Sequence, residues 1–142
     1  MSEKRILAIN PGSTSTKIAV YEGNKSIFLK TLRHSTEELK DFNHIAEQFQ
    51  FRREIILSEL QAAGIEVSSL GVIVGRGGLV KPIPSGVYEV NDALVEDLKR
   101  GVLGEHASNL GGLIALDIAK SIDGARAFIA DTVVVDELQD VA

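Results

Sequence analysis

Eight residues near the start of the chain have the composition of a phosphate-binding loop. The segment NPGSTSTK, residues 10–17, lies between two apolar runs, 6–9 and 18–21. Pro-Gly is a turn signal, and glycine lets a backbone approach a ligand closely. Serine and threonine hydroxyls can donate to phosphate oxygens, and a lysine adds a point charge that suits phosphate. The candidate phosphate-binding residues are Asn10, Gly12, Ser13, Thr14, Ser15 and Lys17.

This loop differs from the phosphate loop of strand–loop–helix nucleotide-binding proteins. That loop has a second glycine directly before its lysine and continues into a helix. Here no glycine precedes Lys17, and the residues after it are apolar and β-rich. The pattern predicts a strand–loop–strand hairpin with an anion at its tip. A polar hairpin turn that binds nothing is the alternative.

Three more polar residues lie where predicted elements begin or end. Arg76 lies among glycines, and its planar five-donor fork suits a carboxylate or a transferring phosphoryl group. His106 comes shortly before a predicted helix start, where a lone histidine is more often a satisfied or solvated residue than a ligand. Asp131 follows an apolar strand, where a carboxylate could hold Mg²⁺. The alternatives are a surface arginine, a solvated histidine and a strand-end cap.

The order of elements predicts a mixed α/β sheet flanked by helices. The expected strands are 5–10, 16–21, 26–33, 70–74 and 127–130. The expected helices are 42–60, capped by Asp41 or Asn43 and stopped at Gly64, then 91–99 and 109–120. Three antiparallel strands thus open the fold, and helical crossovers follow. Asn10, Arg76 and Asp131 each follow an apolar strand, so we expect them at one edge of the sheet.

Composition limits the possible classes of protein. The 142 residues, 44% of them hydrophobic, suffice for one domain with one core. A net charge of −5, with no cluster of lysine and arginine, argues against a nucleic-acid surface. The chain has no cysteine, and no apolar run approaches the ~20 residues that a membrane helix needs. With no signal-peptide pattern before the first strand, we expect a soluble cytoplasmic domain that binds neither nucleic acid nor membrane.

Four segments resemble the acetate and butyrate kinase family. Residues 10–17 match the pattern N-x-G-S-[ST]-S-x-[KE] at every fixed place, and segments 75–79, 105–112 and 131–138 agree as well. The resemblance covers essentially the whole chain. The residues of these segments are more similar to those of the butyrate and branched-chain fatty acid kinases than to those of the acetate kinases.

The resemblance implies a fold and an activity. It implies a ribonuclease H-like domain, as in actin-like ATPases, with residues 1–142 as an N-terminal domain and a C-terminal nucleotide-binding domain outside this chain. It implies reversible phosphoryl transfer from ATP, with Mg²⁺, to a short or branched-chain carboxylate such as butyrate, giving an acyl phosphate. The full-length enzyme would be a homo-oligomer, and we expect the isolated chain to be inactive. The alternatives are an acetate or propionate kinase, or a non-catalytic anion-binding fragment.

The resemblance also assigns roles to single residues. Arg76, His106 and Asp131 would be catalytic, with Asp131 and Asn10 near Mg²⁺. The stiff loop 81–86 would form a wall of the acyl pocket. His34 and His44 have no evident partner and are expected to be structural or solvent-facing. The glycine pair at 111–112, early in a helix, predicts close backbone packing.

Overall fold

The computed structural model describes residues 5–76, 87–103 and 107–130, which contain one mixed sheet of six strands. Its order is β3-β2-β1-β4-β6-β5. The strands are β1 (Arg5–Pro11), β2 (Ser15–Glu22), β3 (Lys25–Arg33), β4 (Leu70–Arg76), β5 (Val87–Glu89) and β6 (Arg126–Ala130). The first three are antiparallel, as predicted, and β4 and β6 continue the sheet parallel to β1. The edge strand β5 runs antiparallel to β6.

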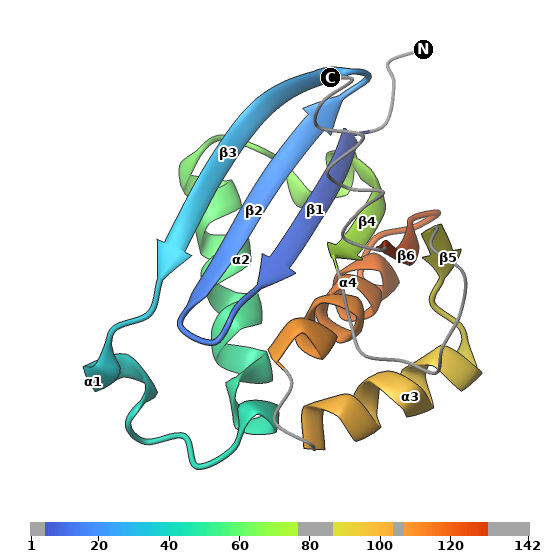
Figure 1. The fold of residues 1–142 in the computed structure, drawn as a ribbon. Helices are drawn as coiled ribbons and strands as arrows, with labels where there is room; N and C mark the ends of the chain where they lie inside the picture. Colours follow the sequence, from blue (N-terminus) through green and yellow to red (C-terminus); the bar gives the residue numbers. More distant parts are fainter. Residues whose placement is uncertain (1–4, 77–86, 104–106, 131–142) are drawn as a thin grey trace.

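Helices lie against one face of this sheet (Figure 1). The α-helices are α1 (Thr36–Leu39), α2 (Phe49–Ala62), α3 (Asp92–Leu103) and α4 (Leu110–Lys120). Three short 3₁₀ helices are η1 (Ile45–Gln48), η2 (Val67–Ser69) and η3 (Ala107–Asn109). The core forms where α2 and α4 meet the sheet, with Ile56, Leu60 and Ile114 fully buried against strand residues.

Side chains alternate between the two faces of the sheet, as strand geometry requires. Leu7 and Ile9 of β1 are buried toward the helices, and Leu7 pairs with Val20 of β2 and Ile73 of β4. Ala8, which lies between them, points to the opposite face. No described helix covers that opposite face (Figure 1). The sheet therefore has an apolar helix side and a second side that carries the polar residues at the strand ends.

The helix predicted over 42–60 differs from the structure at its start. The predicted helix 42–60 is split, because η1 precedes α2 and Phe42 lies outside both. Neither Asp41 nor Asn43 caps it: Glu47 accepts hydrogen bonds from the backbone amides of Asn43 and His44. The predicted stop is confirmed, because Gly64 has a φ of 76° just after α2 ends.

Helix α1 and strand β5 were not predicted. Helix α1 is a single turn, and the side chain of its N-cap, Ser35, accepts from the amide of Glu38 at 3.1 Å. Strand β5 spans only three residues and is held through its pairing with β6. Helix α3 also runs four residues beyond the predicted end at 99. Such short elements depend on partners far away in the sequence, which local periodicity does not report.

The glycine pair at the start of α4 packs directly against a strand, as predicted. A Cβ added to Gly75 of β4 would lie 2.3 Å from the carbonyl carbon of Gly111 and 2.4 Å from the amide nitrogen of Gly112. A Cβ on Gly111 would lie 3.1 Å from Cδ of Pro11. The first turn of α4 therefore touches the ends of β1 and β4, and only glycine permits this approach.

We expect Gly75→Ala to lower the free energy of unfolding by about 3 kcal/mol or more, because the new methyl group would overlap the peptide between Gly111 and Gly112. Urea denaturation followed by circular dichroism measures this change. Gly12→Ala is the matched control, since its Cβ would meet only Ser15, with Oγ at 3.3 Å. Equal stability of the two variants would contradict the close-packing explanation.

Candidate functional site

The candidate residues that the structure describes meet at one edge of the sheet, where β1 and β4 end and β2 begins. Asn10 of β1 lies opposite Lys17 of β2 in the antiparallel ladder. Ile9 pairs with Gly75, so the residues that follow them, Asn10 and Arg76, turn to the same face. That face is the one without a described helix. Asn10, Lys17 and Arg76 therefore share one edge and one face, and for Asn10 and Arg76 the shared edge was predicted from the sequence.

The loop between β1 and β2 is a tight hairpin. The amide of Gly12 donates to the carbonyl oxygen of Ser15 at 2.7 Å, and the amide of His34 donates to the carbonyl oxygen of Thr14 at 2.9 Å. Ser13 and Thr14 at its tip are exposed. The hydroxyls and backbone amides of the tip are therefore available to an anion.

A buried arginine lies beneath this loop. Arg52 of α2 is fully buried and donates to the carbonyl oxygens of Ser13 and Ser15, both at 3.0 Å. It also donates to Oγ1 of Thr16 at 3.3 Å and to Oε1 of Gln48. Sequence analysis missed Arg52. Its burial could have been inferred from helical spacing, because Arg52 lies four residues before Ile56 and eight before Leu60, on the same face of the helix. Gln48, one turn earlier, lies on that face as well.

His34 has a partner that was not expected, although a structural role was one of the two roles predicted for it. Its Nε2 lies 2.9 Å from Oγ1 of Thr16, its ring meets the ring of Phe51 edge-on, and the residue is 5% exposed. Burial lowers the pKa of His34, and the nearby charge of Arg52 lowers it further, against a smaller opposite effect of Glu38. His34 is therefore a structural residue that supports the loop in its neutral form.

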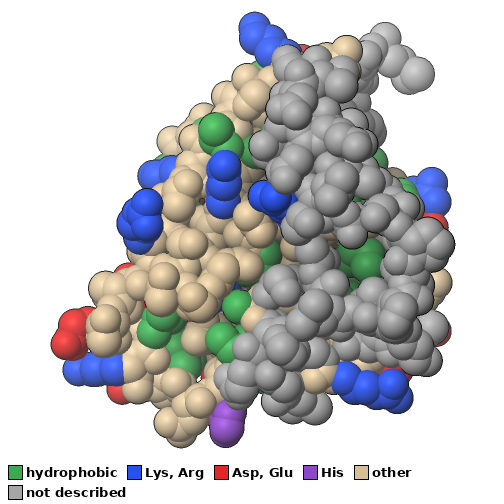
Figure 2. All heavy atoms as spheres, viewed as in Figure 1, with side chains coloured by type: hydrophobic (Ala, Val, Ile, Leu, Met, Phe, Trp, Pro, Cys, Tyr) green, Lys and Arg blue, Asp and Glu red, His purple; other side chains and the backbone are tan. Residues whose placement is uncertain are grey.

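Basic side chains accompany the loop on the helix-free face. Arg33 at the end of β3 is exposed and lies opposite Ser15 in the ladder, two pairs beyond the pairing of Lys17 with Thr31 and therefore on the same face. Figure 2 shows Lys and Arg side chains on the visible part of this face, over the strands β1 to β3. Lys17 and Arg33 form no ion pair with any residue in the described ranges. The charged side chains that the described strands carry on this face at this end, those of Lys17, Arg33 and Arg76, are all basic, although the chain is acidic overall.

Two predicted catalytic residues, His106 and Asp131, lie outside the described residues, as does the predicted pocket wall 81–86. Within the described ranges, no group of three His, Cys, Asp or Glu residues could hold a metal ion. Mg²⁺ in phosphate sites needs only one or two protein ligands, with phosphate oxygens and water as the others. Asn10, paired with Lys17, has the side-chain oxygen that one such ligand requires, and its role toward Mg²⁺ stays a prediction.

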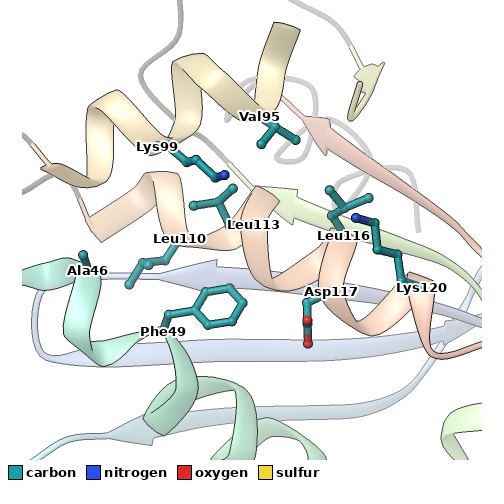
Figure 3. A pocket seen from close by; sticks show the side chains of 9 residues that line it. All are labelled: Ala46, Phe49, Val95, Lys99, Leu110, Leu113, Leu116, Asp117 and Lys120. Atoms are coloured by element: carbon teal, nitrogen blue, oxygen red, sulfur yellow. The ribbon is translucent and has the colours of Figure 1, made fainter. Parts of the chain in front are cut away.

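A cavity of about 530 Å³ lies elsewhere, between α4 and the neighbouring residues of η1, α2 and α3. Figure 3 shows its apolar floor, formed by Phe49, Leu113 and Leu116, with Lys99 and Lys120 at the rim. Its one acidic residue, Asp117, is paired with Arg53. None of the predicted site residues lines this cavity, so we place the candidate site at the strand ends instead.

Comparisons with solved structures define the class of fold. The acetate kinase of Porphyromonas gingivalis matches with a TM-score of 0.58 at 16% identity, over 90% of this chain and 37% of that one. A propionate kinase of Francisella tularensis gives 0.56, also at 16% identity, over 90% and 36%. An exopolyphosphatase of Cytophaga hutchinsonii gives 0.57 at 13% identity, over 99% and 59%. The chain has the ribonuclease H-like fold of the actin-like ATPases.

Curated relatives narrow the class. Butyrate kinase 1 of Clostridium acetobutylicum is 62% identical over 138 residues, which are 97% of this chain and 39% of that protein. A probable butyrate kinase of Clostridium botulinum is 54% identical over the same share of each chain. No family model matches the sequence. The chain is a homologue of the butyrate kinases that spans 39% of their length.

No helix in the described part of the chain is long and apolar enough to cross a membrane.

Proposed function

We propose that this chain forms the phosphate-binding and acyl-binding part of a butyrate kinase, which transfers a phosphoryl group between ATP and butyrate. The observation that carries the proposal is the meeting of Asn10, Lys17 and Arg76 on one face at the strand ends. The identity of 62% to butyrate kinase 1 over nearly the whole chain also supports the proposal. Acetate or propionate as the acceptor is the alternative, since acetate and propionate kinases share the fold.

The site residues would act mainly by positioning and by neutralising charge. A carboxylate oxygen of butyrate attacks the γ-phosphorus in line, the bond to the ADP oxygen breaks, and butyryl phosphate and ADP leave. Lys17 and the hydroxyls and amides at 13–15 would hold the transferring phosphate, and Arg76 would hold the carboxylate or the phosphoryl oxygens. Asn10 and Asp131 would lie near Mg²⁺, whose charge offsets that of the phosphates, and His106 would donate to the transition state.

The adenosine pocket has no candidate among the described residues. We propose that it lies in a second domain, within the part of the butyrate kinases that this chain does not span. We further propose that the complete enzyme is cytoplasmic and homo-oligomeric, as the sequence resemblance implies.

A chimera tests the function. This chain replaces the matching stretch of butyrate kinase 1 of Clostridium acetobutylicum, and the product acyl phosphate is trapped as the hydroxamate from ATP, Mg²⁺ and each of acetate, propionate, butyrate and isobutyrate. We expect turnover with the highest kcat/KM on butyrate or isobutyrate, because the residues of the motifs are more similar to those of the butyrate kinases than to those of the acetate kinases. The parent enzyme is the control. A folded chimera that phosphorylates none of these acids would contradict the proposal. A chimera that prefers acetate or propionate would show that the alternative acceptor is the correct one.

A further inference from the structure

The most unusual residue outside the predicted site is the buried arginine beneath the loop. Arg52 has no accessible surface, although arginine is almost never fully buried without an acidic partner. Its hydrogen bonds within the described residues all go to neutral oxygens, and no carboxylate lies at ion-pair distance there. Such a charge is costly to bury unless something compensates it.

The contacts of Arg52 orient the loop. One terminal nitrogen donates to the carbonyl oxygen of Ser15, and the other donates to the carbonyl oxygen of Ser13. In a trans peptide the N–H points opposite to the C=O, and no described peptide is cis. The amide of Thr14, which shares a peptide with the carbonyl of Ser13, therefore points away from Arg52 toward the exposed loop tip.

The guanidinium is itself held in place. Oε1 of Gln48, one turn earlier, accepts from Nε at 3.1 Å and from one terminal nitrogen at 2.8 Å. Oγ1 of Thr16 adds a contact at 3.3 Å and is tied to His34. Arg52 is thus fixed by neutral groups on both sides, in a geometry that leaves its charge directly behind the loop.

This charge persists at neutral pH. Burial lowers the pKa of Arg52 to about 10, which still leaves the guanidinium protonated near pH 7. A positive charge in a site poorly accessible to water acts more strongly on a nearby anion than an exposed lysine does. A phosphate on the outer side of the loop would supply the missing negative charge.

We propose that Arg52 is a positioning residue of the phosphate site, which aims the amide of Thr14 outward through its hydrogen bond to the carbonyl oxygen of Ser13 and whose buried charge is neutralised by the phosphate. This inference rests on the proposed function, because it assumes that the loop between β1 and β2 binds phosphate.

Titration of this chain with inorganic phosphate tests the inference. The amide signals of residues 12–17 in ¹⁵N–¹H spectra report binding, and we expect the Kd to rise at least tenfold in Arg52→Met. Arg53→Met is the matched control: Arg53 is the next residue of α2, loses the same charge, and pairs with Asp117 and Glu54 instead of the loop. Its Kd should equal that of the unchanged chain.

Two milder variants guard against a failure of Arg52→Met to fold. Arg52→Lys keeps the charge but cannot bond both carbonyls as the fork does, so we expect partial rescue, with a Kd between those of the unchanged chain and Arg52→Met. Gln48→Met removes the side chain that holds the guanidinium and leaves the loop sequence intact, and it should weaken phosphate binding several-fold. Urea unfolding of each variant separates affinity from stability.

The outcomes distinguish the two proposals. If Lys17→Ala abolishes phosphate binding while Arg52→Lys and Gln48→Met bind as tightly as the unchanged chain, Arg52 only stabilises the fold and the inference is wrong. In that case the proposed phosphate site stands. If the unchanged chain shows no phosphate-dependent shift at residues 12–17, the loop assignment fails and the inference fails with it.

Discussion

Lys17→Ala in the chimera should lower kcat/KM for butyrate at least 100-fold with little change in stability. Lys17 lies opposite Asn10 at the strand ends, and its ammonium group pairs with no described carboxylate, so its charge is available to the transferring phosphate. Removing one donor that acts on transition-state charge typically costs about 10²- to 10³-fold in rate. Steady-state kinetics by hydroxamate formation, with ATP and butyrate varied in turn, measures the loss.

The control for this variant is Lys25→Ala. Lys25 lies on the same hairpin of β2 and β3 but at the opposite end of the sheet, where it is exposed and pairs with Glu22 in the ladder. Removal of its charge should leave kcat/KM within about twofold, as expected for a distant surface lysine. A comparable drop in both variants would point to a general effect of net charge and would remove Lys17 from the site.

The second large effect concerns the chain of 142 residues by itself, which should form no butyryl phosphate. Phosphoryl transfer requires nucleotide and acceptor to be held together, and that positioning is worth about 7–11 kcal/mol of the barrier. This chain spans 39% of butyrate kinase 1, and no described residue forms an adenosine pocket. Purified chain with ATP, Mg²⁺ and butyrate should give no more hydroxamate than the same chain with Lys17→Ala.

The chimera serves as the positive control for that assay. Turnover by the unchanged chain well above its Lys17→Ala variant would show that one domain suffices. Such a result would overturn the argument that a second domain holds the nucleotide, although the roles proposed for the loop residues would remain.

Much of the fold could be predicted because its signals are local. The alternation of buried and partly buried residues in β1, the turn at Gly23 and the helix stop at Gly64 all depend on neighbours within a few residues. The types and spacing of Asn10, Gly12 and Lys17 in the loop 10–17 are likewise local, and the phosphate site that they indicate stays a prediction. His106 and Asp131 stay predictions, since they lie outside the described residues.

The remaining differences arise from long-range contacts. Strand β5 exists through its ladder with β6, some forty residues later, and its three residues carry no periodicity of their own. The partner of His34 is Thr16, across the hairpin, so the sequence around His34 could not reveal that it is buried. Helix α2 starts late because Glu47 bonds back to the amides of Asn43 and His44, where a helix was expected.

The sequence by itself determined which chemistry the strand ends can carry, because the types and spacing of Asn10, Lys17 and Arg76 are local properties of the chain. Only the tertiary structure decided that these residues share one face and that Arg52, some forty residues after the loop, lies behind it. The physical reason is that the register of β1 with β4 and the burial of Arg52 on α2 depend on strand pairing and helix packing. Both involve residues far apart in the sequence, so no short segment can determine them.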